Sequence, residues 1–240
     1  MKIKIIGNSC TWTNRPNPQY LVNDEMLIDT PQSSTKFLFG SYDFEKLKYI
    51  LITHFHSDHF ADLHIIYDEL KKRTKNLEKV TVVGPKTLFK RLMGMFKIFE
   101  LGYRKKKDIK EVFNIIELKD GDKLTLGDYE IEMVRVKHNV KYPFGFILKQ
   151  KGSSKTIGFS GDSAMCDGLI KIVKMSDIVF LDCVMSPANN IHLSADEILH
   201  LQKEFKGKTF YSTHHVPDQL PEKYQGKIIL PPIGKTYQIK

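Results

Sequence analysis

The sequence predicts an α/β protein, because short strand-like runs alternate with helical ones along the whole chain. Two apolar runs, Tyr49 to Ile52 and Ile178 to Leu181, have the length of a buried strand and are too short to cross a bilayer as a helix. No Gly/Ser linker, low-complexity tract or internal repeat divides the 240 residues. We therefore expect one globular domain over residues 1–240, with 41 % hydrophobic residues available for its core.

The expected strands are short and bounded by turn-forming residues. The first, over residues 2–6, alternates lysine with isoleucine, as a half-buried strand does. Turns at Asp120-Gly121-Asp122 and Gly127-Asp128 separate three consecutive strands, because these residues tolerate the backbone angles of tight turns. Strands are expected over residues 2–6, 19–22, 26–29, 48–53, 80–83, 112–118, 123–126, 129–137, 144–149, 155–159, 178–182, 208–212 and 227–230.

Helices are expected over residues 34–40, 58–72, 85–101, 167–175 and 194–204. The last has the clearest start, because Ser194 followed by Glu197 forms a capping box that satisfies free amides of the first turn. The segment from Met93 to Lys110 mixes apolar residues with many cations. We interpret it as an amphipathic helix packed on the body or, alternatively, as a substrate-side cover or a homodimer contact.

The chain is basic, with 37 Lys and Arg against 28 Asp and Glu and a formal charge of +9. Part of the charge is clustered at Lys71-Lys72-Arg73, Lys90-Arg91 and Arg104-Lys105-Lys106-Lys107. A basic surface raises the encounter rate with anions such as phosphate esters or nucleic acid. Charge runs also occur on ordinary solvated helix faces, so the charge alone does not establish a nucleic-acid partner.

The amino terminus and the cysteines predict a cytoplasmic protein. The first residues lack the long apolar region of a secretion signal. Cys10, Cys166 and Cys183 are odd in number and widely scattered, which fits neither a disulfide framework nor a paired-thiol zinc site. We expect them to be reduced and mostly structural.

The strongest functional signal is the segment Thr53-His54-Phe55-His56-Ser57-Asp58-His59, which directly follows a strand-like run. On an extended chain, residues two apart point the same way, so His54 and His56 can bind one ion. If the backbone then turns, Asp58-His59 is carried toward a neighbouring point in space. Imidazole nitrogen and carboxylate oxygen are ligands that zinc, iron and manganese accept. The segment therefore predicts a metal site, in preference to a histidine-rich surface turn.

Four further ligand-type residues lie at the ends of expected strands or beside a helix start. Each of them alone would be interpreted as a turn or hydrogen-bonding residue. Together with the cluster that begins at His54 they become candidate ligands or catalytic groups. They are His138, Asp162, His192 and His214.

In this order the motifs resemble the metallo-β-lactamase superfamily, and the resemblance covers nearly the whole chain. It rests on His-x-His-x-Asp-His from His54, the single His138, Asp162 within Ser-Gly-Asp-Ser, and Thr213-His214. The loop Ile5-Ile6-Gly7-Asn8-Ser9 and the segment Leu27-Ile28-Asp29-Thr30 lie where that superfamily has a glycine turn and a structural aspartate. The resemblance implies an αββα sandwich of two mixed β-sheets flanked by helices, with metals at one edge.

The resemblance also implies two divalent metal ions as cofactors, zinc first and manganese or iron as alternatives. The implied ligands are His54, His56 and His138 for one ion, Asp58, His59 and His214 for the other, and Asp162 between them. His215 is the reserve choice for His214. The β-lactam-cleaving members often have cysteine where this chain has Asp162, which argues against antibiotic hydrolysis.

Such a site is expected to hydrolyse esters. Two divalent ions held about 3.5 to 4 Å apart would supply a hydroxide near neutral pH, and Asp58 would both bind metal and accept a hydrogen bond from that nucleophile. His192, followed by Leu193 and a helix start, resembles an element of the ribonuclease Z and phosphonate-pathway cyclic-phosphate phosphodiesterase branch. There a histidine lies near the scissile phosphate and can stabilise charge or protonate the leaving group. Asp58 and His192 are therefore the expected catalytic residues of a phosphodiesterase acting on a phosphate ester or nucleotide-type substrate.

Two alternatives remain open at this point. A lactone or thioester hydrolase would use the same metals and leave His192 with a structural role. A basic nucleic-acid-binding protein would hold its metal without catalysis.

Transfer-RNA processing is disfavoured. In ribonuclease Z the RNA-gripping arm is inserted between the third histidine and the bridging aspartate, whereas here only 24 positions separate His138 from Asp162. The expected partner is an anionic small molecule or nucleotide, RNA is the alternative, and no membrane partner is expected.

Overall fold

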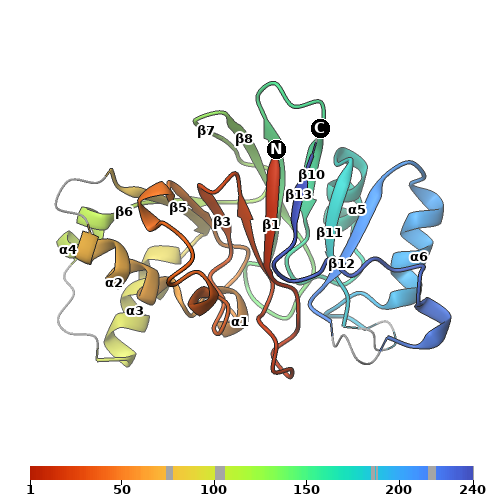
Figure 1. Cartoon of the computed structure of the whole chain (residues 1–240), viewed down its shortest axis with the longest axis horizontal. Coiled ribbons are helices and arrows are strands. Elements are labelled where there is room, and N and C mark those ends of the chain that lie inside the picture. The colour runs from red at the N-terminus through yellow and green to blue at the C-terminus, as the bar shows by residue number, and fades with distance from the viewer. Residues whose placement is uncertain (74–77, 101–105, 185–186, 188, 216–219, 240) are drawn as a thin grey trace.

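Two mixed β-sheets lie face to face, and helices pack against their outer faces (Figure 1). The computed structural model describes residues 1–73, 78–100, 106–184, 187, 189–215 and 220–239. The first sheet has the strand order β13-β1-β2-β3-β4-β5-β6, and the second has the order β12-β11-β10-β9-β8-β7. The predicted αββα sandwich is confirmed.

The strands of the first sheet are β1 (Lys2–Gly7), β2 (Gln19–Val22), β3 (Met26–Ile28), β4 (Tyr49–Leu51), β5 (Val80–Pro85), β6 (Phe113–Leu118) and β13 (Thr236–Gln238). Those of the second are β7 (Lys123–Leu126), β8 (Tyr129–Arg135), β9 (Phe144–Gln150), β10 (Thr156–Phe159), β11 (Ile178–Asp182) and β12 (Thr209–Thr213). The α-helices are α1 (Ser57–Phe60), α2 (Leu63–Arg73), α3 (Leu88–Ile98), α4 (Lys106–Val112), α5 (Asp167–Met175) and α6 (Ala195–Glu204). Among the described residues, none of these helices has both the length and the apolar character needed to cross a bilayer.

The core is layered because alternate residues of a strand face opposite sides of its sheet. In β4, Ile50 packs toward the helices and Leu51 packs between the sheets. Between the sheets the ring of Tyr20 lies 5.0 Å from that of Phe159 and 4.9 Å from that of Phe180, measured between centroids. Apolar burial on both faces fixes the register of the strands, because a slip of one residue would turn every side chain to the wrong face.

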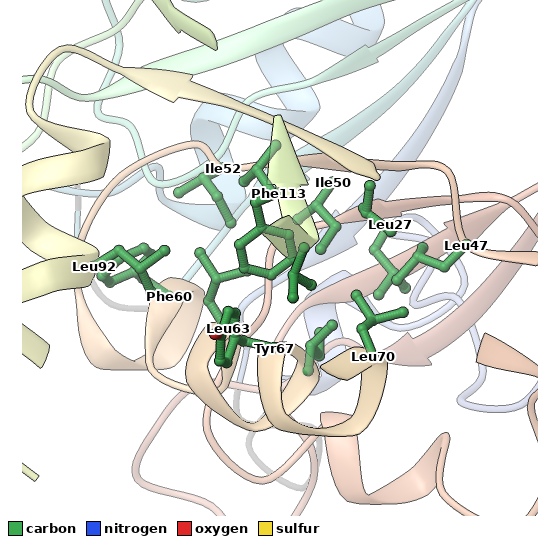
Figure 2. Close-up of a cluster of buried hydrophobic side chains, with 14 of the residues drawn as sticks. Leu27, Leu47, Ile50, Ile52, Phe60, Leu63, Tyr67, Leu70, Leu92 and Phe113 are labelled. Carbon is green, nitrogen blue, oxygen red and sulfur yellow. The ribbon is translucent and has the colours of Figure 1, made fainter. Parts of the chain in front are cut away.

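Helices α2 and α3 cover the outer face of the first sheet. Figure 2 shows side chains of the sheet facing those of α2, with Phe113 of β6 between Ile50 and Ile52 and Leu92 of α3 at the edge of the cluster. The sheet contributes Leu27, Ile50 and Ile52, and α2 contributes Leu63, Tyr67 and Leu70. This spacing of three and four residues along α2 is the apolar stripe of an amphipathic helix.

Three predicted elements are wrong. The helix expected over residues 34–40 is only a 3-10 turn, Thr35–Phe37. The helix expected over 58–72 is divided into α1 and α2, because the amide of Asp62 donates to the carbonyl of Thr30 at 2.9 Å. The strand expected over 227–230 is reduced to an isolated bridge between Tyr211 and Ile229. Conversely, β13 and α4 were not among the expected elements.

The basic segment from Met93 to Lys110 is divided between α3 and α4, and its residues 101–105 lie outside the described residues. Phe96 is buried in the core, as the interpretation of an amphipathic helix requires. Ile98 and Phe99 at the end of α3 nevertheless expose 78 % and 50 % of their surface. This end of the helix therefore presents apolar side chains to solvent.

Parallel pairing brings the candidate residues to one edge of both sheets. In the first sheet β3 and β4 are parallel, and in the second β10, β11 and β12 are parallel. The carboxyl ends of neighbouring parallel strands meet at the same edge, where α/β proteins commonly place their sites. Asp29 and Thr53 follow strands of the first sheet, while Asp162, Asp182 and His214 follow or end strands of the second.

Candidate metal centre

The segment from His54 to His59 lies at the carboxyl end of β4. The chain stays extended as far as His56, whose backbone angles are φ −67° and ψ 153°, and α1 begins at the next residue. The first turn of α1 brings Asp58 back toward the histidines, and the ring centroid of His59 lies 4.2 Å from that of His54. His54, Asp58 and His59 are buried, whereas His56 is half-buried. The strand followed by a turn, expected from the sequence, is the geometry observed.

All seven predicted ligands come together in two groups that share one residue. Within each group one ligand atom per residue lies within 4.8 Å of the others. The first group is His54, His56, His138 and Asp162, and the second is Asp58, His59, Asp162 and His214. The structure thus brings together residues that are up to 160 positions apart, as 54 and 214 are in the sequence. Their role as ligands remains a prediction.

Asp162 lies between the two groups. Its Oδ1 is 3.0 Å from Nε2 of His59. Its Oδ2 lies 3.5 Å from Nε2 of His214, 3.7 Å from Nε2 of His138 and 3.8 Å from Nε2 of His54. Four imidazoles therefore surround one carboxylate that exposes only 3 % of its surface. Because a carboxylate has two oxygens, a residue in this place can contact two cations at once.

The imidazoles are held in orientation by hydrogen bonds on their other nitrogen. Nδ1 of His59 lies 2.7 Å from Oδ2 of Asp29, and Nδ1 of His138 lies 2.9 Å from the carbonyl oxygen of Ile191. Asp29 also accepts hydrogen bonds from the amide and the hydroxyl of Thr53, both at 2.8 Å. Such outer partners fix the tautomer and the direction of a metal-binding histidine.

The backbone is strained at two residues of the site. Asp29 has φ 61° and His214 has φ 57°, angles that non-glycine residues rarely adopt. Gly161 also has a positive φ of 58°, and a Cβ added there would lie 2.8 Å from the carbonyl oxygen of Phe144 and 2.9 Å from Cβ of Thr53. Because glycine has no Cβ, the backbone after β10 can lie close to Phe144 and Thr53, and this position brings Asp162 to the centre.

The unpaired buried atoms fit divalent cations. Among the described residues, Nε2 of His54 is buried without a hydrogen-bond partner, and Nε2 of His59 and Oδ1 of Asp162 are buried with only each other, at 3.0 Å. Buried polar atoms are rarely left unpaired, so each requires an explanation. All three are nitrogen or oxygen donors directed into the groups described above, and zinc, manganese and iron accept such donors.

The charge balance of the centre differs between the two groups. In the first, burial lowers the pKa of His54 and of His138, so these imidazoles are neutral, the form that binds metal. In the second, burial lowers the pKa of His59, but Asp162 and Asp29 outweigh it and hold that pKa well above its ordinary value. Burial also lowers the pKa of His214, but the neighbouring Asp162 outweighs burial and holds that pKa well above its ordinary value. His59 and His214 are therefore protonated, and their positive charge neutralises nearby carboxylates in the place of a cation.

His192 lies beside the centre, and its catalytic role stays a prediction. Its ring stacks on that of His214 with 5.2 Å between centroids and 15° between planes. Its Nδ1 lies 2.7 Å from Oδ2 of Asp182, a buried carboxylate that also accepts a hydrogen bond from the amide of Ser163 at 3.0 Å. Burial lowers the pKa of His192, but Asp182 more than compensates and raises it. A third group of ligand atoms within 4.8 Å joins Asp162, Asp182, His192 and His214.

Sequence reasoning missed two residues of the site. Asp182 contacts His192 and also places Oδ1 3.4 Å from Nδ1 of His214. Thr11 donates from its hydroxyl to Oδ2 of Asp58 at 2.6 Å. The only signal for Asp182 is its position as the last residue of an apolar run, the same kind of signal that singled out Asp162. Thr11 lies in a loop and has no signal in the sequence.

His215, the reserve choice, belongs to none of the three groups of ligand atoms. It is buried, and burial lowers its pKa to about 4. Its backbone carbonyl accepts a hydrogen bond from the amide of Cys10 at 3.1 Å. The ligand geometry therefore favours His214 over His215.

Comparison with known proteins extends the resemblance seen in the sequence. Residues 2–230 match the protein family described as Anti-Pycsar protein Apyc1. The metallo-beta-lactamase fold protein YhfI from Bacillus subtilis superposes with a TM-score of 0.78 at 20 % identity, covering 98 % of both chains. Human tRNase Z, short form, gives a TM-score of 0.77 at 18 % identity, covering 100 % of both chains. A diphosphatase from the PhnP family gives 0.77 at 18 % identity, covering 100 % of this chain and 98 % of the other. At these identities the structures establish the metallo-β-lactamase fold.

Proposed function

The chain belongs to the family of anti-Pycsar protein Apyc1, and on its metallo-β-lactamase fold we propose that it is a dinuclear metal-dependent phosphodiesterase acting on a nucleotide-type phosphate ester. The observation that carries the proposal is the convergence of two ligand groups on Asp162, with His192 beside them. When bound, two divalent ions would supply Lewis acidity toward a phosphoryl oxygen and lower the pKa of water toward neutrality. Zinc is the proposed metal, with manganese or iron as alternatives.

Asp58 is the proposed positioning carboxylate for the attacking water. Its Oδ2 accepts hydrogen bonds from Thr11 Oγ1 at 2.6 Å and faces Nε2 of His214 at 3.1 Å. These contacts hold one carboxylate oxygen in place and leave the other oxygen to accept a proton or a hydrogen bond from water. Burial raises the pKa of Asp58, but the hydrogen bond with His214 outweighs it, and the net shift is downward. The group is therefore anionic and able to act as an acceptor.

His192 is the proposed acid for the leaving alkoxide. Because Asp182 occupies Nδ1, the proton available for donation lies on Nε2. The imidazole is half-buried and stacked on His214, which fixes its plane beside the centre. A charged imidazole in this position also stabilises negative charge that develops on the phosphoryl group.

The comparisons support chemistry at phosphorus. One similar structure is named a tRNase and another a diphosphatase, and both names refer to cleavage at phosphate groups. In this chain the connection between His138 and Asp162 is formed by β9, β10 and their turns, with no inserted arm. We therefore propose a compact substrate, smaller than transfer RNA.

Metal-loaded protein is expected to hydrolyse bis(p-nitrophenyl) phosphate and to lose that activity after chelation. The measurement is release of p-nitrophenolate, with zinc, manganese and iron loaded separately and metal content determined by elemental analysis. A lactone and a thioester serve as comparison substrates, because the same fold can present its metals to a carbonyl. Hydrolysis of either of these with none of the phosphodiester would refute the proposal, and so would nucleic-acid binding without any turnover.

Asp182→Asn is expected to lower turnover by about 10- to 100-fold, the loss seen when the outer partner of a metal-binding histidine is removed. Asparagine keeps the shape of the side chain but removes the charge that fixes the tautomer of His192. The measurement is kcat at saturating metal, so that any loss of metal caused by poorer positioning of His214 does not contribute. If Asp182 acts through His192, adding Asp182→Asn to His192→Ala should cost little further turnover, whereas additive losses would contradict the coupling.

A further inference from the structure

Trp12 presents an indole ring to solvent at the metal-binding edge of the protein. It is the only tryptophan of the chain. Its exposed fraction of 81 % is the largest among the large hydrophobic residues that the structure describes. Tryptophan is highly buried on average in folded proteins, so this exposure is unusual for the residue type. The residue two positions earlier, Cys10, is fully buried, and the chain therefore turns outward at Trp12.

The loop that carries Trp12 is held at the second ligand group by two hydrogen bonds. The hydroxyl of Thr11 donates to Oδ2 of Asp58 at 2.6 Å. The amide of Cys10 donates at 3.1 Å to the carbonyl oxygen of His215, which follows the last predicted ligand. In Figure 1 the loop after β1 projects from the edge at which α1 lies. Consecutive Cα atoms are only about 3.8 Å apart, so the indole begins one residue away from the contact with Asp58.

The backbone on the other side of Trp12 is also fixed. The amide and the hydroxyl of Thr13 both donate to the carbonyl oxygen of Cys10, at 3.3 and 3.1 Å. The amide of Arg15 donates in turn to the hydroxyl of Thr13 at 3.2 Å. Hydrogen bonds of this kind between a threonine and nearby backbone groups stabilise tight turns. Because the turn is already ordered, little conformational entropy is lost when the ring binds a ligand.

The chemistry of the ring indicates what it binds. An indole offers a flat apolar face, and another flat ring stacks on such a face. The proposed substrate is a nucleotide-type phosphate ester, in which a flat base is joined to the phosphate through one sugar. A phosphate at the second ligand group therefore places its base within the neighbourhood of Trp12. Binding residues are often found on loops that a rigid scaffold positions, as this loop is.

We propose that Trp12 is a substrate-contacting residue whose indole stacks on the base of the nucleotide that is bound at the metal centre. The inference rests on the proposed function and adds to it the residue that distinguishes a nucleoside ester from a simple alkyl ester. The metal centre would bind the phosphate of either ester. Only the nucleoside ester has a ring for Trp12 to contact.

The first test uses the intrinsic fluorescence of Trp12, which no other tryptophan obscures. Thymidine 5′-monophosphate, titrated into zinc-loaded protein, is expected to quench this fluorescence saturably, because the stacked base contacts the indole. Deoxyribose 5-phosphate has the same sugar and phosphate without the base and should leave the fluorescence unchanged. Thymidine has the base without the phosphate and measures collisional quenching. Quenching by the monophosphate that does not exceed that by thymidine would overturn the inference.

The second test compares two chromogenic substrates that share a leaving group. Thymidine 5′-(p-nitrophenyl phosphate) retains a nucleoside on phosphorus, whereas methyl p-nitrophenyl phosphate retains a methyl group. Trp12→Leu is expected to reduce the preference for the nucleoside ester by about fivefold or more in kcat/KM, mostly through KM, the least that one base–aromatic stack contributes. Trp12→Phe is the matched control, because it keeps an aromatic face and should retain most of the preference.

The outcomes separate this inference from the proposed function. Absence of bis(p-nitrophenyl) phosphate hydrolysis would refute the proposed function. Equal losses on both chromogenic substrates in Trp12→Leu, or equal losses of preference in Trp12→Leu and Trp12→Phe, would refute only the stacking role. Because Trp12 is exposed, its replacement should leave the fold intact. Size-exclusion chromatography completes the test: a changed oligomeric state with an unchanged preference would assign Trp12 to a contact between copies of the chain, and the inference would fail.

Discussion

Asp162→Ala is expected to reduce the metal content of both ligand groups and to lower kcat/KM for bis(p-nitrophenyl) phosphate by about a thousandfold or more. The carboxylate lies between the groups, within 3.0 to 3.8 Å of four imidazole nitrogens. Loss of this carboxylate removes one predicted ligand from each group and also removes the carboxylate beside His54 and His138. Metal ions contribute several kcal/mol to hydrolytic transition states, which corresponds to a thousandfold effect.

The measurements are elemental analysis of the purified variant and hydrolysis at saturating metal. Circular dichroism shows whether the variant remains folded. Asp177→Asn is the matched control, because Asp177 precedes β11 at its other end and accepts a hydrogen bond from the amide of Thr156 at 2.8 Å. It should keep full metal and activity. An Asp162→Ala protein that retains both ions and its turnover would show that the two ligand groups do not share this residue.

His138→Ala provides a comparison within the same centre. His138 belongs to the first group only, so this variant should lose less metal than Asp162→Ala. If the two variants lose the same amount, the groups bind their ions in an interdependent way. The comparison therefore measures how far Asp162 couples the two positions.

The part of the site that the sequence predicts well is the part fixed by local geometry. The segment from His54 to His59 needs only an extended stretch and one helical turn, and both follow from the residues themselves. His138, Asp162 and His214 could be proposed because each follows a recognisable strand. Their meeting point depends on the parallel order of β10, β11 and β12, which neither propensity nor periodicity specifies. That order entered the prediction only through the resemblance to a known family.

Asp182 shows the limit of such reasoning. It ends the apolar strand β11 in the same way that Asp162 follows β10, and nothing in the spacing distinguishes a ligand from the partner of a catalytic histidine. Its role becomes visible only in the folded protein, where β11 lies between β10 and β12 and Nδ1 of His192 lies within hydrogen-bond distance of Asp182. The division of α1 from α2 has a similar origin. The periodicity over 58–72 is continuous, and hydrogen bonds with the segment after β3 interrupt it: the amide of Asp62 donates to the carbonyl of Thr30, and the amide of Thr30 donates to the carbonyl of His59.

His192→Ala is expected to have a large effect that depends on the leaving group. Two substrates with the same 5′-nucleotide but different leaving groups distinguish proton donation from other roles. Cleavage of thymidylyl-thymidine releases an alkoxide, which needs a proton. A general acid accelerates such a step by about 10²- to 10⁴-fold. In thymidine 5′-(p-nitrophenyl phosphate) the phenolate leaves without protonation. The variant should therefore lose most of its kcat on the first substrate and less than about tenfold on the second.

Metal content decides whether this loss is chemical. His192 is not among the seven predicted ligands, although its ring stacks on that of His214, so the variant should bind the same amount of metal as the parent. His200→Ala is the matched control, since His200 lies on α6 with its side chain 69 % exposed and should leave kcat unchanged. Equal losses on both substrates would assign His192 to charge stabilisation at the phosphoryl group instead of proton donation. Unchanged turnover on both would reduce His192 to a packing residue beneath α6 and remove the feature that favours phosphodiesters over lactones and thioesters.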